Sequence, residues 1–220
     1  METIYKHILA FMLTASLVFA PAAYAKNEKH AQPTLMSLQG TAVRYLINPF
    51  GEVDGLFLDN DTLVRMPPHM SGDVAELVKL GDTIALQGTL EGKSSFNAYS
   101  ITNTASDQTL VRREPAWNGK VMPKELRVAE LKEISANGKI ERIITGKHGE
   151  PRIILLADGT NVRLPKDVAY DAYSLITAGA PFAAKGSGTE TRYGRSLEAS
   201  AIGSNPASLK PLSGAFGLTN

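Results

Sequence analysis

The chain has 220 residues, of which 43% are apolar and 20% are charged, enough for one medium-sized or two small globular domains. It contains no cysteine, which excludes disulfide bonds, thiolate metal sites, a cysteine nucleophile and lipid attachment at an N-terminal cysteine. The formal net charge of +1 lacks the basic surplus that neutralises phosphates, so we expect no general nucleic-acid binding.

Residues 1–25 have the pattern of a signal peptide. Lys6 and His7 precede an apolar run over residues 8–20, and Ala23-Tyr24-Ala25 offers an A-x-A cleavage site. The run is shorter than the roughly 20 residues of a membrane span. We predict cleavage before Lys26, export to the periplasm as a soluble protein and no membrane span after cleavage; an uncleaved anchor is the alternative.

A duplication organises the rest of the chain. When the sequence is shifted by 98 positions, residues 40–88 align with residues 138–186 without a gap, and TLVRMP at 62–67 returns as TNVRLP at 160–165. Two copies of about 70 residues favour two separate domains over a solenoid. Fourteen of the 49 aligned positions are identical: Gly40/Gly138, Arg44/Arg142, Gly51/Gly149, Glu52/Glu150, Leu58/Leu156, Thr62/Thr160, Val64/Val162, Arg65/Arg163, Pro67/Pro165, Asp73/Asp171, Leu77/Leu175, Gly81/Gly179, Ala85/Ala183 and Gly88/Gly186.

Each copy predicts three strands first. A long strand, 34–47 or 130–144, has a glycine near its middle, where a bend or bulge is expected. The turn that follows contains Gly51 or Gly149, which is free to take positive φ. The second strand is an apolar run around Phe57 or Leu155, and the third alternates apolar and polar residues.

A short helix and two strands complete each copy. Pro67 or Pro165 ends the third strand, because proline cannot donate to the ladder. In the first copy Ser71 is expected to cap the helix and Gly81 to end it. The last strands are TIALQGTL with NAYSITN, and PFAAKGS with LEASAIG; the second copy needs about three extra residues between them.

This order of elements, with a long bent first strand, is that of an OB-fold barrel. The predicted fold class is all-β, with two tandem OB-fold-like five-stranded barrels, each with one short helix between strands three and four. An SH3-like barrel is the alternative. The predicted domains are a first barrel over 34–104, a linker over 105–132, a second barrel over 133–203 and a flexible tail over 204–220.

The stretches NPFGEVDGLFLDNDTLVRMPPHM (48–70) and LVKLGDTIALQG (77–88) resemble secreted bacterial OB-fold proteins of unassigned function, here in tandem. The resemblance covers most of residues 34–104 and, more weakly, residues 130–203. It implies the fold and no catalytic residue.

The sequence predicts neither an enzyme nor a cofactor. Three histidines remain after residue 25, and none has the spacing of a catalytic triad or a metal site. One local hypothesis is a Cu(I) site in RMPPHM, since Met66, His69 and Met70 supply two thioethers and an imidazole within five residues. Core packing of both methionines is the favoured alternative, because Met66 aligns with Leu164 and Met70 with Val168.

A second hypothesis places a ligand on the second barrel. OB barrels bind ligands on strands two and three, between the loops that join strands one to two and four to five. In the second copy those loops contain Lys147 and His148, then Arg192, Tyr193 and Arg195. Cations beside an aromatic ring suit a small anionic or saccharide ligand. The favoured alternative is that these hairpin tips are simply solvated. For the repeated Arg65 and Arg163 we likewise favour ion pairing with a neighbouring acid over ligand contact.

We therefore expect a non-catalytic periplasmic binding or adaptor module that acts through protein–protein interaction with an envelope protein. Residues 34–104 carry 4 basic and 8 acidic side chains, whereas residues 133–203 carry 9 and 8. Residues 105–132 carry 6 basic and 4 acidic side chains, so the opposite signs can dock this linker on the first barrel or can guide a partner. Fold alone does not choose between this function, ligand capture and copper binding.

Overall fold

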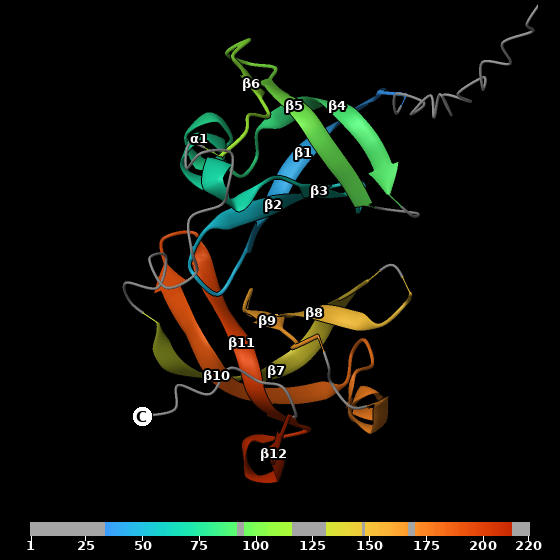
Figure 1. The fold of residues 1–220 in the computed structure, drawn as a ribbon, viewed down its shortest axis with the longest axis vertical. Coiled ribbons are helices and arrows are strands. Elements are labelled where there is room, and N and C mark those ends of the chain that lie inside the picture. The colour runs from blue at the N-terminus through green and yellow to red at the C-terminus, as the bar shows by residue number, and fades with distance from the viewer. Residues whose placement is uncertain (1–33, 92–94, 116–130, 147, 167–169, 213–220) are drawn as a thin grey trace, which may run out of the picture. The chain divides into compact units, whose positions relative to one another are not determined.

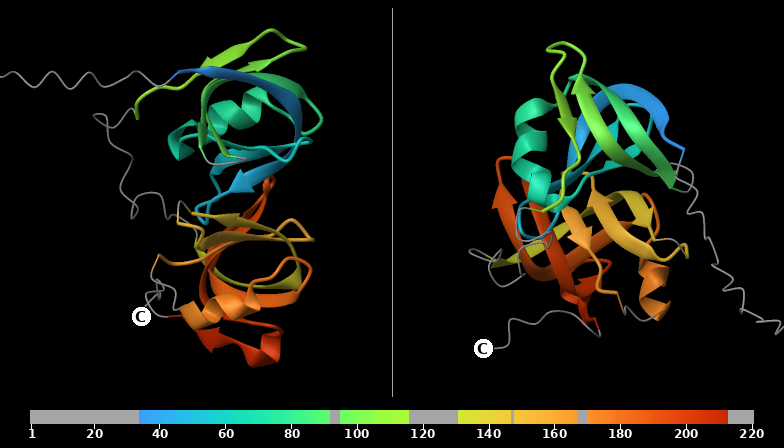
Figure 2. Two further views of the ribbon diagram at one scale, coloured as in Figure 1. Left: turned by 90° about the vertical axis from the view of Figure 1, so that its right-hand side faces the viewer. Right: turned by 45° about the horizontal axis from the view of Figure 1, so that its top comes forward.

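A computed structural model describes residues 34–91, 95–115, 131–146, 148–166 and 170–212, all within the single compact unit that residues 33–220 form. Strands dominate it and close into two barrels, one after the other along the chain, which confirms the predicted fold class (Figures 1 and 2). The predicted signal peptide lies outside the described residues.

The first barrel follows the predicted order of elements. Its sheet runs β3-β2-β1-β4-β5-β6 and is closed by parallel pairing of β3 with β5. The elements are β1 (Met36–Ile47), β2 (Val53–Leu58), β3 (Leu63–Arg65), the 3-10 turn η1 (Pro68–Met70), α1 (Ser71–Leu77), β4 (Thr83–Glu91), β5 (Ser95–Asn103) and β6 (Thr109–Val111).

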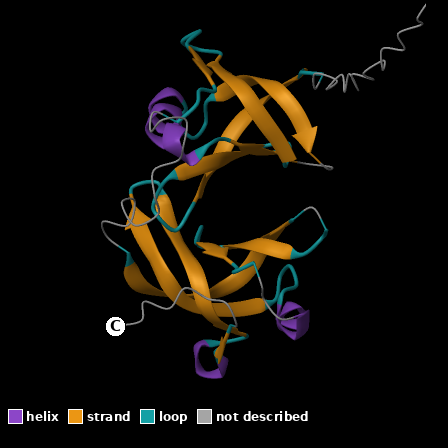
Figure 3. Ribbon diagram, in the orientation of Figure 1, coloured by secondary structure: helices purple, strands orange, loops and turns teal. Residues whose placement is uncertain are grey.

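The second barrel repeats this topology, and β9 pairs in parallel with β11. Its connection between strands three and four is the 3-10 helix η2 rather than an α-helix (Figure 3). The elements are β7 (Lys132–Thr145), β8 (Pro151–Leu156), β9 (Asn161–Arg163), η2 (Tyr170–Leu175), β10 (Pro181–Thr191), β11 (Gly194–Gly203), η3 (Pro206–Ser208) and β12 (Lys210–Pro211).

The long first strand serves two neighbours, which is why it must bend. Residues 36–41 of β1 pair with β4, and residues 42–47 pair with β2. Gly40 lies at the change of partner, where a Cβ would approach the Leu58 side chain to 3.0 Å. The turn glycines adopt positive φ as predicted, 81° at Gly51 and 84° at Gly149.

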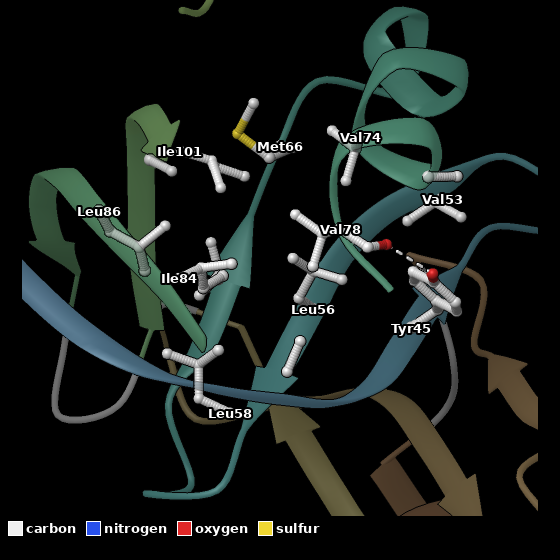
Figure 4. Close-up of a cluster of buried hydrophobic side chains, with 14 of the residues drawn as sticks. Tyr45, Val53, Leu56, Leu58, Met66, Val74, Val78, Ile84, Leu86 and Ile101 are labelled. Carbon is white, nitrogen blue, oxygen red and sulfur yellow. Dashed lines mark hydrogen bonds between the residues drawn. The ribbon is translucent and has the colours of Figure 1, made fainter. Parts of the chain in front are cut away.

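The core of the first barrel fills the space between the strands and α1 (Figure 4). Val74 and Val78 are fully buried there, and the Tyr45 hydroxyl donates to the Val78 carbonyl at 2.7 Å. The prediction that Ser71 caps the helix is wrong. Its hydroxyl instead accepts a hydrogen bond from the Val53 amide, because Ser71 already lies inside the helix.

Each barrel carries a sixth short strand. β6 lies within the segment predicted as a linker and β12 within the predicted tail, and they pair with β5 and β11 at equivalent positions. Leu110 and Leu212 pack against the two cores. The structural repeat is therefore longer than the repeat that the sequence alignment shows. The sixth strands pair through backbone hydrogen bonds, which do not require similar side chains.

Candidate functional site

A third apolar cluster joins the two barrels. It is built from the outer faces of β1, β2 and β3 and of β7 and β8. Phe57 and Leu155 are 5% and 1% exposed, although each points away from its own barrel core. The members of the cluster are Leu46, Phe57, Leu63, Ile144, Ile153 and Leu155.

Equivalent positions of the repeat meet in this cluster, since Leu46 aligns with Ile144 and Phe57 with Leu155. The arginines of two ion pairs are also equivalent, although their acids are not. Arg44 pairs with Glu141 of the second barrel at 2.9 Å, and the equivalent Arg142 pairs with Asp61 of the first. The two copies thus contact each other through overlapping surfaces, with some positions shared and others different.

The repeated arginine of the third strand makes different contacts in the two copies. Arg163 donates to both carboxylate oxygens of Asp54 at 2.7 Å, so the predicted ion pair exists but its acid comes from the other barrel. The equivalent Arg65 instead donates to the Ser95 hydroxyl at 3.2 Å. Burial raises the pKa of the Asp54 carboxyl above its ordinary value, and the attraction of Arg163 only partly opposes that effect.

The interface occupies the surface on which OB barrels usually bind ligands. That surface is the outer face of strands two and three. In the first barrel this face carries Phe57 and Leu63, and in the second it carries Ile153 and Leu155. All four side chains are buried against the opposite barrel. The usual ligand face of each copy is therefore covered within the chain.

The long β10–β11 hairpin also contacts the first barrel. The Tyr193 ring meets Tyr45 edge to face, with ring centroids 5.5 Å apart, and packs against the first core. The Arg192 guanidinium lies 4.8 Å from the centre of the Tyr193 ring. Burial, with Tyr193 next in importance, raises the pKa of Tyr45. The extra residues of this hairpin reach the neighbouring barrel.

Two glycines allow that contact. A Cβ at Gly194 would lie 2.9 Å from the Ile47 side chain, and one at Gly51 would lie 2.8 Å from Thr191. At Gly149, the equivalent of Gly51, a Cβ would meet nothing within 4 Å. The turn after the first strand thus contacts the β10–β11 hairpin in the first copy, whereas the equivalent turn in the second copy has free space beside its glycine.

Among the predicted ligand residues that the structure describes, Arg192 and Tyr193 contact each other, whereas His148 and Arg195 make other contacts. Lys147 lies outside it. The His148 amide donates to Glu150 in its own turn at 3.0 Å, and the Arg195 carbonyl accepts from Asn161 at 3.3 Å. No contact among described residues links His148 to Arg192, Tyr193 or Arg195. Ligand capture by these loops stays a prediction without a preformed site.

The proposed copper ligands are also separated by burial. Met66 and Met70 are 4% and 0% exposed and belong to the first core, whereas the His69 Nε2 atom lies 2.8 Å from the Arg113 carbonyl. The core packing of both methionines agrees with the favoured alternative, and Cu(I) binding stays a prediction. Among the described residues, no three His, Cys, Asp or Glu side chains form a metal-binding group.

The exposed apolar residues are confined to the first barrel. Seven large apolar side chains are about half exposed, and none of them belongs to the described residues of the second barrel: Leu35, Met36, Val43, Leu80, Leu90, Tyr99 and Val111. Three of these lie close together along the chain or across the β1–β4 pairing, and we call them the apolar lip: Leu35, Met36 and Leu90. Met36 pairs with Gly88, two residues before Leu90, so the lip joins the start of β1 to the end of β4.

The sequence contained a signal for the interface. Leu56-Phe57-Leu58 and Ile154-Leu155-Leu156 are continuous apolar runs, which are typical of strands buried on both faces. A barrel core buries only one face, so such runs indicate a second packing partner.

The comparisons with known proteins found no matching family model, curated protein or solved structure. No helix among the described residues has the length and apolar character needed to cross a membrane.

Proposed function

We propose that this protein is a non-catalytic binding or adaptor module of the cell envelope that acts through protein–protein contact. The observation that supports this proposal is the apolar lip of the first barrel. Exposed apolar side chains that are grouped in one region can mark an interaction surface. The partner would present an apolar patch with basic residues around it, since residues 34–104 carry twice as many acidic as basic side chains.

Site-specific photo-crosslinking in the exported protein tests this function. A photoreactive amino acid at Leu90 should yield one discrete crosslinked product, and the same probe at His148, which is exposed on the second barrel, should not. A Leu90→Glu variant, probed at Met36, should lose that product while its melting temperature stays close to that of the unsubstituted protein, because the Leu90 side chain is half exposed. Identical products from both positions, or a product that survives Leu90→Glu, would contradict the proposal.

A further inference from the structure

A groove of about 540 Å³ lies on the outer face of the first barrel, on the sheet β1-β4-β5-β6. Strand pairing arranges its outward side chains in two rows across these four strands. One row is Gln39, Ala85, Thr102 and Thr109, and the other is Ser37, Gln87, Ser100 and Val111. Four strands spaced about 4.8 Å apart make this face about 14 Å wide.

The groove is uncharged, and its lining mixes polar and apolar groups. None of the described residues that line it carries a carboxylate, an ammonium, a guanidinium or an imidazole group. Its outward polar groups are hydroxyls and primary amides, and the Thr102 and Thr109 hydroxyls lie 2.8 Å apart. Hydroxyls both donate and accept hydrogen bonds, so the surface suits a ligand that also does both.

Tyr99 adds an aromatic ring at the edge of the groove. Gln87 pairs with Ser100 and Gly88 with Ala98, which leaves Tyr99 as the extra residue of a β-bulge. Bulges re-aim side chains and are frequent beside binding sites. The ring is 49% exposed, while the Tyr99 carbonyl is fixed by a hydrogen bond from the Arg112 amide at 2.7 Å.

The second barrel has the same bulge but not the same surface. The extra residue there is Ser200, and its hydroxyl donates to the Lys185 carbonyl at 3.1 Å. Lys185 stands where Gln87 stands and pairs with Glu133 at 3.0 Å. The η3 turn covers Gly203, where a Cβ would lie 2.5 Å from the Ser208 carbonyl oxygen. The neutral groove with an aromatic ring therefore distinguishes the first copy from the second.

We propose that this groove binds an uncharged oligosaccharide. The exposed Tyr99 ring stacks on the apolar face of a sugar ring, and the amides and hydroxyls of Gln39, Gln87 and Thr109 exchange hydrogen bonds with sugar hydroxyls. An aromatic platform with a few polar groups is the usual composition of a small-ligand site. This inference does not rest on the proposed protein–protein function, which concerns the lip.

Two other ligand classes fit less well. An anionic ligand would need a cation, which the described lining residues do not supply. An extended peptide gains most of its affinity from backbone hydrogen bonds at a free sheet edge. β6 is the outermost strand of this sheet, but the middle strands of the face, β4 and β5, are each paired on both sides.

Titration with cellohexaose, chitohexaose and maltohexaose, followed by calorimetry and by the NMR signals of Tyr99, tests the proposal. We expect at least one to bind with a dissociation constant of about 1 mM or tighter. Its affinity should change less than about twofold between 50 and 500 mM salt, because no exposed charge takes part. Absence of binding by all three overturns the proposal. Preferential binding of a sulfated hexasaccharide that is lost at high salt also overturns it.

Two variants copy the second barrel into the first. Tyr99→Ser, which introduces the residue found at the bulge of the second copy, should weaken sugar binding at least about tenfold. Gln87→Lys should weaken it by removing an amide from the centre of the groove. Leu80→Ser is the matched control, because Leu80 is 50% exposed but does not line the groove, and its affinity should stay within about twofold. Equal loss in Leu80→Ser, or none in Tyr99→Ser, overturns the assignment, while the lip crosslink is unaffected by either result.

Discussion

In the first barrel Arg44 pairs with an acid of the second barrel, and in the second barrel the equivalent Arg142 pairs with an acid of the first. The faces away from this interface differ between the copies. Tyr99 lines a groove in the first barrel, whereas the equivalent Ser200 donates a hydrogen bond to the Lys185 carbonyl of its own sheet. The shared face holds the copies together, and the divergent face is the one left for a ligand. In this duplicated protein, specificity is therefore to be sought where the repeats differ.

The largest expected effect concerns the asymmetric ion pair between the copies. Arg163→Ala leaves Asp54 buried without its partner, and the loss of one member of a buried pair typically costs about 3 kcal/mol of unfolding free energy. Asp54→Asn should cost less than about 1 kcal/mol, because it also removes the charge that burial disfavours. Urea unfolding measures both.

Arg65→Ala is the control for this comparison, since Arg65 occupies the same position of the first copy and donates to the Ser95 hydroxyl. Its loss should cost about 1 kcal/mol. Equal losses in Arg65→Ala and Arg163→Ala would mean that the repeated arginine acts within each barrel and not between them.

The sequence predicted the elements of each barrel but not how the barrels meet. The turns could be predicted from repeated glycines such as Gly51 and Gly149, because a residue with positive φ is usually glycine. The covering of the ligand face depends on outward residues such as Phe57 and Leu155, whose partner lies about 100 residues away. Contacts between residues so far apart leave no periodic pattern in the sequence. The only sequence signal for them was the pair of apolar runs typical of strands buried on both faces.

Short-range reasoning also misplaced individual roles. Ser71 has the residue type of a cap, yet it bonds to the Val53 amide from within the helix. Tyr193 has the residue type of a ligand-stacking ring, and in the structure that ring meets Tyr45 of the first barrel. The side chains of Ser71 and Tyr193 can each interact with several kinds of partner. In both cases the tertiary fold determines which partner is in contact.

An intermediate effect is expected at this hairpin. Tyr193→Ala removes a half-buried ring from the first core and should lower the unfolding free energy by about 2 kcal/mol. Arg192→Ala should cost less than about 0.5 kcal/mol, since its side chain is exposed where it stacks on Tyr193 and donates to the Tyr193 hydroxyl. Thermal unfolding of the two variants compares them directly. A Tyr193→Ala protein as stable as Arg192→Ala would mean that the hairpin does not brace the first barrel.

The smallest effect is the pH dependence at position 54, where the first copy has Asp and the second has Arg152. Because burial raises the folded-state pKa of Asp54 above 3.8, the folded protein holds this proton more tightly than the unfolded chain does. Linkage then requires the contribution of Asp54 to stability to be full below the unfolded pKa and to fall as the pH rises through the folded pKa. The unfolding free energy of the unsubstituted protein, measured relative to Asp54→Asn, should therefore increase as the pH is lowered from 7 toward about 4. A decrease over the same range would show that the Arg163 attraction outweighs burial, and the interface would then be strengthened by its charge and not merely tolerant of it.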